Sequence, residues 1–206
     1  MSLAIVVLGG CSGLPDKPTR ATMYDFGPGP LTAPATRQAP LPPLALDQIA
    51  TAGGALDNMA VLYRLGYADA QQLRPYAQAR WSMPPAQLVR QRLVDQLGQR
   101  RAIFHAGAPL ALNRSQNAAL PLLLRLDLDE FSQLFTAPEA SVGLIRLRAT
   151  LVEVTPAGEK LLGQRNVVVQ RPAPTGDAPG GVRALTAATD AAIEEIDQWL
   201  QQMPAR

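Results

Sequence analysis

The sequence is poor in the residues that catalytic and metal sites most often use. Among its 206 residues there is one cysteine, Cys11, and one histidine, His105. A lone cysteine cannot form an internal disulfide or a thiolate zinc site, and a catalytic triad would have to use His105. His105 follows Phe104 at the expected end of a short strand, where a structural histidine is a better interpretation than a catalytic base. We therefore predict a protein without catalytic residues, metal or cofactor.

Charge is also scarce. Charged residues make up 17% of the chain, the formal net charge is +2, and the 19 basic residues are scattered. A nucleic-acid-binding protein needs a clustered basic face, so we predict no nucleic-acid partner. No Lys-Ser/Thr pair follows a glycine-rich loop, which argues against an ATPase. Hydrophobic residues reach 47%, which favours one folded domain over a disordered chain.

Long apolar runs are absent except at the start of the chain, where residues 3–8 lead into Gly9, Gly10 and Cys11. An apolar run that ends in small residues is typical of the later part of a secretory signal. The tetrapeptide Leu8-Gly9-Gly10-Cys11 resembles the lipobox of bacterial lipoproteins. This resemblance implies that the Cys11 thiol receives a diacylglycerol and that Cys11 becomes the first mature residue. Ser12 resembles an outer-membrane sorting signal.

No Lys or Arg precedes the apolar run, so we interpret residues 1–10 as the remnant of a lipoprotein signal peptide. The alternative is that residues 3–8 form a buried strand and that Cys11 is an inert loop residue. Gly-Gly-Cys-Ser-Gly would be an unusual end for a strand, which favours the lipobox. We expect residues 11–20 to be a lipidated tether and residues 21–206 to form one domain.

Within that domain, alternating apolar residues predict strands, and apolar residues at helical spacing predict two helices. Proline, glycine, alanine and threonine are frequent from 15 to 43, which predicts an extended tether around a first strand at 22–26. A connection at 64–83 is expected to lead to Ser82, which would cap the first helix. Further strands are expected at 44–49, 56–65, 102–104, 120–131, 142–154 and 161–169, and helices at 86–98 and 182–203.

This order of elements indicates a single α/β domain with a mixed, largely antiparallel sheet flanked by helices. Along the two clearest strands, outward Arg and Asp side chains are expected to pair across antiparallel neighbours. The carboxylates of Asp127, Asp129 and Glu130 lie close in sequence and raise the possibility of a cation site. Because they alternate with leucines, a solvated sheet face is the favoured interpretation.

These features together resemble one family, the ABC-type transport auxiliary lipoproteins. The resemblance rests on the lipobox, the Tyr24-Asp25-Phe26 strand, the Trp81-x-x-Pro84-Pro85 start of a leucine-rich helix, the strands at 120–131 and 142–154, and the closing amphipathic helix. It implies a three-layer sandwich like the anticodon-binding domain. It also implies a non-catalytic periplasmic subunit anchored in the outer membrane, whose partners are an MCE-domain protein and an ABC permease and ATPase. The implied cargo is lipid or another hydrophobic molecule, and the subunit is expected to form a homo-oligomer.

Trp81, Tyr76 and Arg80 are candidates for a partner interface, because Trp, Tyr and Arg are enriched where interfaces are most tightly bound. The alternative is that Trp81 only covers the start of its helix. Another function is also open: an envelope assembly or structural lipoprotein unrelated to lipid transport. An exported hydrolase is disfavoured, because no nucleophile and base can be assembled around one histidine.

Overall fold

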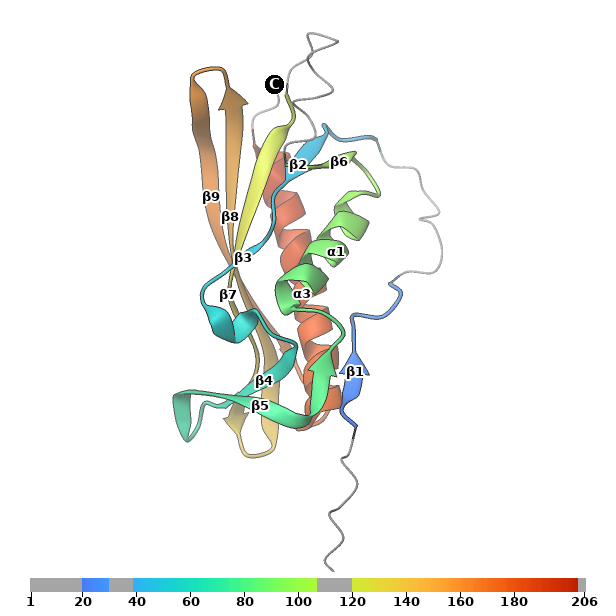
Figure 1. Cartoon of the computed structure of the whole chain (residues 1–206), viewed down its shortest axis with the longest axis vertical. Coiled ribbons are helices and arrows are strands. Elements are labelled where there is room, and N and C mark those ends of the chain that lie inside the picture. The colour runs from blue at the N-terminus through green and yellow to red at the C-terminus, as the bar shows by residue number, and fades with distance from the viewer. Residues whose placement is uncertain (1–19, 30–38, 107–119, 204–206) are drawn as a thin grey trace, which may run out of the picture.

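The computed structural model describes residues 20–29, 39–106 and 120–203. They form a curled sheet of nine strands with two α-helices against its inner face (Figure 1). The chain enters at one end of the long axis through β1 and finishes near the opposite end with the last turn of α3 (Figure 1). The expected single α/β domain with a mixed sheet is confirmed.

Three long antiparallel strands form the centre of the sheet: β7 (Leu122–Ala137), β8 (Ala140–Thr155) and β9 (Gly158–Pro172). Leu126 pairs with Ala149 and Leu147 pairs with Val167, and all four side chains are at most 2% exposed. The expected alternation therefore does place these apolar side chains on one face. The expected end of β7 at 131 is wrong, because the strand continues through polar residues that are buried.

The shorter strands join β7 along its length. β2 (Leu44–Leu46), β3 (Ala50–Thr51) and β4 (Ala60–Leu65) all run parallel to β7. β6 (Ile103–His105) adds to β2 in parallel. The strand expected at 56–65 begins later, because the short 3-10 helix η1 (Gly54–Leu56) precedes it.

Two strands were not predicted: β3, which has only two residues, and the longer strand that follows β4. β5 (Asp69–Trp81) pairs antiparallel with β4, and β1 (Thr22–Tyr24) then pairs in parallel with β5. The sequence analysis treated 64–83 as a connection, because Gln, Arg and Pro interrupt any apolar alternation there. Pairing on both sides, rather than strand propensity, holds β5 in an extended conformation.

Both helices lie on the inner side of the curled sheet, where α3 packs on β7, β8 and β9 and α1 packs against α3 (Figure 1). α1 (Pro85–Leu97) agrees with its prediction, but Ser82 does not cap it: Pro84 holds the N-cap position, and the Ser82 N–H donates to the Tyr24 carbonyl at 2.7 Å. α3 (Ala178–Gln202) begins four residues before the expected start, because the Asp177 side chain accepts from the Gly180 N–H at 2.8 Å. The residues predicted to face inward on α3 are all buried: Val182, Leu185, Thr189, Ala192, Ile196, Trp199 and Leu200.

Candidate partner interface

The three residues expected at an interface all lie on β5, but in different environments. Trp81 is 0% exposed and packs against Phe26 and Phe131, with ring centroids 5.7 and 5.6 Å away. Its indole N–H has no hydrogen-bond partner among the described residues. The Trp81 side chain is therefore part of the core at the start of α1, which corrects the expectation that it contacts a partner.

Tyr76 is half-buried and firmly held. Its hydroxyl donates to Gln133 Oε1 at 2.7 Å, and its ring centroid lies 4.6 Å from that of Tyr63. Gln133 is itself 0% exposed and donates from Nε2 to Ser141 Oγ at 2.8 Å. Burial, together with the nearby Tyr63 and Asp177, raises the pKa of Tyr76 to about 12. The phenol therefore stays neutral at physiological pH.

Arg80 is also half-buried, and its guanidinium binds the backbone of its own strand. Nη1 donates to the carbonyls of Tyr76 and Ala79 at 2.7 and 2.8 Å. In the sheet, Arg80 pairs with Met23 of β1, which is 55% exposed. Because paired residues point to the same face, Arg80 and Met23 share the outer surface of this sheet edge.

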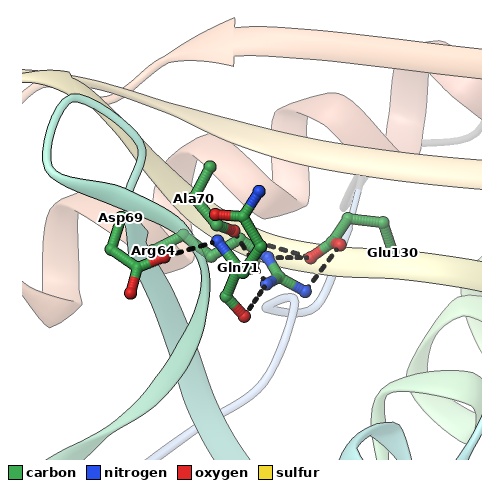
Figure 2. Close-up of polar contacts among 6 residues, drawn as sticks. Arg64, Asp69, Ala70, Gln71 and Glu130 are labelled. Carbon is green, nitrogen blue, oxygen red and sulfur yellow. Dashed lines mark hydrogen bonds and ion pairs between the residues drawn. The ribbon is translucent and has the colours of Figure 1, made fainter.

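Figure 2 shows how the hairpin of β4 and β5 is fastened to β7. Arg64 of β4 makes a two-pronged ion pair with Glu130 of β7, with Nη2–Oε2 at 3.0 Å and Nε–Oε1 at 3.3 Å. Arg64 Nη1 donates to the carbonyls of Ala70 and Gln71 at 3.1 and 3.2 Å. Ser132 Oγ adds a hydrogen bond of 2.7 Å to Glu130. The two charged side chains are 21% and 14% exposed, so the pair is largely shielded from water.

This arrangement, which we call the Arg64 clasp, fixes the turn between the two strands. Asp69 Oδ1 accepts a hydrogen bond from the Gln71 N–H at 3.0 Å (Figure 2). The Ala68 N–H donates to the Leu65 carbonyl at 2.9 Å. The turn presents Tyr67, which is 48% exposed. The clasp is not predicted by the sequence, because Arg64 and Glu130 are 66 residues apart and neither belongs to a motif.

The carboxylates at the end of the predicted strand do not lie on a simple solvated face. Glu130 belongs to the clasp, and Asp129 accepts from Arg148 Nη2 at 3.2 Å, which confirms ion pairing across the antiparallel strands. Arg146 is exposed on the same face and belongs to no ion pair within the described residues. A shallow hollow of about 540 Å³ lies here, lined by Asp129, Arg146, Arg148, Gln164, Asn166 and Val168.

The remaining residues singled out from the sequence show no catalytic arrangement in the part of the chain that the structure describes. His105 is exposed at the end of β6, where its Nδ1 contacts Arg90 Nη2. Within residues 20–29, 39–106 and 120–203, no three His, Cys, Asp or Glu side chains are grouped to hold a metal ion. Cys11, with Leu8, Gly9 and Gly10, lies outside the described residues. No helix in the described segments is both long and apolar enough to cross a membrane.

A comparison with known protein families identifies the family of the chain. Residues 24–197 match the family described as the ABC-type transport auxiliary lipoprotein component. The chain belongs to this family. The match covers α1, most of α3, the β4–β5 hairpin and the three long strands, so the resemblance found from the sequence is confirmed. The family is described as an auxiliary component, and it places the protein with an ABC transport system.

Solved structures share the fold at low sequence identity. One is a protein of Xanthomonas campestris assigned to the DUF330 family, with a TM-score of 0.65 and 17% identity. The alignment covers 86% of this chain and 94% of that one. Another is an uncharacterized protein, with a TM-score of 0.60, 15% identity, and coverage of 88% and 99%. No curated protein matches the sequence. At such identities the structural matches establish the fold alone.

Proposed function

We propose that the protein is a non-catalytic auxiliary subunit of an ABC transport system that contains an MCE-domain protein. A lipid on Cys11 holds it in the periplasm, at the outer membrane. The cargo of the system is lipid or another hydrophobic molecule that must cross the envelope. The subunit binds and tethers, and a partner permease and ATPase supply the energy.

The observation that carries this proposal is the position of Leu8-Gly9-Gly10-Cys11 directly before the family domain. The family match begins at Tyr24, thirteen residues after Cys11. This spacing leaves a short tether between a lipid on Cys11 and the first strand. Each buried acyl methylene contributes about 0.8 kcal/mol, so a triacylated cysteine anchors a protein far more firmly than a single chain would.

The β5 surface supports the partner-binding part of the proposal. Tyr76 is held by Gln133, and Arg80 is held by backbone carbonyls of its own strand. Side chains that are already fixed lose little conformational entropy when a partner binds. The Arg64 clasp extends this rigidity to the whole hairpin (Figure 2). We expect the MCE-domain protein, or a second copy of this chain in a homo-oligomer, to contact this surface.

Lipidation is tested on the chain produced behind a functional lipoprotein signal peptide. Mass spectrometry is expected to show an acylated Cys11 as the first residue, and membrane fractionation is expected to place the protein in the outer membrane. Cys11→Ser should release it to the soluble periplasmic fraction. Ser12→Asp serves as the matched variant, because it keeps the thiol and should redirect the protein to the inner membrane. An unmodified Cys11 with the preceding residues still attached would refute the anchor.

Partner binding is tested by co-purification with an MCE-domain protein of the same system, which we expect to be encoded beside this gene. Arg80→Ala is expected to weaken capture about fivefold, the change that a loss of ~1 kcal/mol at an interface produces. Arg171→Ala is the control, because Arg171 is exposed on β9 and its guanidinium bonds, among the described residues, only to the Gln170 carbonyl. If both variants were captured equally, the surface of β5 would not be part of the interface. Neighbouring genes for cell-wall or outer-membrane assembly alone would favour an envelope-assembly lipoprotein instead.

A further inference from the structure

The anchor side of the molecule is defined by where the described chain begins. The described chain begins just before β1, which lies toward the lower end of the long axis in Figure 1. The β4–β5 turn, the β7–β8 turn and the start of α3 lie at the same end (Figure 1). The β8–β9 turn lies at the opposite, upper end. A lipid on Cys11 therefore attaches to the lower end.

The length of the tether limits how the domain can sit on a bilayer. Arg20 follows Cys11 by nine residues, and a fully extended chain of that length spans roughly 30 Å. β8 alone has 16 residues and spans roughly 50 Å at the usual rise per residue. A domain standing on its upper end would hold Arg20 farther from the bilayer than the tether reaches. The lower end is therefore the one that can stand on the membrane.

The surface chemistry of the lower end suits phospholipid headgroups. Tyr67 in the β4–β5 turn is 48% exposed and Met23 in β1 is 55% exposed. A tyrosine ring is well placed at the boundary between acyl chains and headgroups. Arg20 before β1 and Arg183 in α3 are exposed and can bind lipid phosphates. Three acidic residues are exposed at this end as well, Asp69 in the β4–β5 turn, Glu139 in the β7–β8 turn and Asp177 before α3, so we expect the apolar tips to matter more than net charge.

We propose that this lower end, formed by the β4–β5 turn, the start of β1 and the start of α3, docks on the headgroups of the membrane that carries the anchor. The inference rests on the proposed lipidation of Cys11 and adds an orientation to it. The Arg64 clasp keeps Tyr67 at a fixed height relative to β7, so the turn acts as a rigid contact (Figure 2). The upper end, with the β8–β9 turn, points into the periplasm.

A pair of labelled variants tests the orientation. Ala68 and Ala157 are exposed alanines in turns at opposite ends of the molecule. Because the acylated Cys11 has no free thiol, Ala68→Cys or Ala157→Cys provides one attachment point for a fluorophore. Each lipidated protein is reconstituted on vesicles of phosphatidylethanolamine and phosphatidylglycerol that contain a nitroxide-headgroup lipid. We expect strong quenching of the label at 68 and no quenching above background at 157.

A second comparison separates docking from mere proximity. In the Ala68→Cys protein, the added changes Met23→Ser and Tyr67→Ser should reduce quenching, because both side chains are exposed and are expected to touch lipid. Unchanged quenching would mean that the tether alone sets the distance and would overturn docking. Equal quenching at 68 and 157 in a protein with an acylated Cys11 would overturn the orientation while leaving the anchor intact. An unacylated Cys11 would overturn both the anchor and the inference that depends on it.

Discussion

Replacement of Gly143 by Ala tests how closely α3 packs on the sheet. Gly143 lies in β8, and a Cβ atom added there would sit 2.4 Å from the backbone carbon of Ala184 and 2.5 Å from the backbone nitrogen of Leu185. Ordinary contacts between such atoms need ~3.5 Å, so helix and strand would have to separate by roughly 1 Å. Neither contacting atom belongs to a flexible side chain. The strain must therefore fall on the packing of α3 as a whole.

We expect Gly143→Ala to destabilise the protein by about 2 kcal/mol, the usual cost of overpacking a core, reduced slightly by the lower entropy of the unfolded chain. For a chain of this size, that loss lowers the melting temperature by roughly 4–8 °C. Differential scanning calorimetry of the purified domain measures it. A melting temperature equal to that of the parent protein would refute the close approach of α3.

Two further glycines provide matched controls for the same substitution. Gly158 has a φ of 124° but nothing within 4 Å of an added Cβ, so Gly158→Ala should cost about 1–2 kcal/mol through backbone strain alone. Gly54 has open space and no such φ, and Gly54→Ala should change stability by less than about 0.5 kcal/mol. The order of the three losses thus distinguishes a steric clash from backbone strain and from the general effect of replacing glycine.

Three other predictions concern the polar contacts. Ionisation of Tyr76 should destabilise the fold as pH rises from about 10 to about 12, because the phenol loses its proton at lower pH in the unfolded chain than in the folded one. The free energy of unfolding should fall by about 1 kcal/mol over this range, a value discounted because the ring is half-exposed. Denaturant titrations measure this loss, which should be absent from Tyr76→Phe. In the Arg64 clasp, Arg64→Met and Glu130→Gln should each lower the free energy of unfolding by about 2 kcal/mol, because each leaves a shielded charge without its partner. The double variant should lose at least ~1 kcal/mol less than the sum of the two single losses. Strictly additive losses in urea unfolding would contradict this coupling. The Thr175 hydroxyl and the Gly180 N–H lower the pKa of Asp177, so the stability that its charge provides should be lost as pH falls below 3.8, the ordinary pKa of the carboxyl group in the unfolded chain. Asp177→Ala should lower the free energy of unfolding by about 1 kcal/mol at neutral pH, because it removes the helix cap. Melting curves of this variant should lack the acid-dependent loss.

The sequence predicted the fold best where burial follows a simple period. Leu124, Leu126 and Leu128 alternate without interruption, and the structure places all three on the inner face. The interface residues were harder to separate, because Trp81 and Arg80 are neighbours on one strand. Adjacent residues on a strand point to opposite faces, so the assignment depends on knowing that the segment is a strand and which face is covered. That knowledge comes from pairing partners distant in sequence.

The largest departures from the predicted elements gather at one end of the molecule. β5, the last part of β7 and the first turn of α3 meet around Gln133, whose side chain bonds to Tyr76 of β5 and to Ser141 of β8 and reaches the Thr175 carbonyl at 3.4 Å. The buried Gln133 amide interrupts the apolar alternation from which strands are predicted. Its three hydrogen bonds nevertheless hold three different segments of the chain together. Departures from simple patterning often coincide with functional surfaces. Here they coincide with the lower end, so the polar network that obscured the fold in the sequence is also what would hold rigid the end that we propose to dock on the membrane.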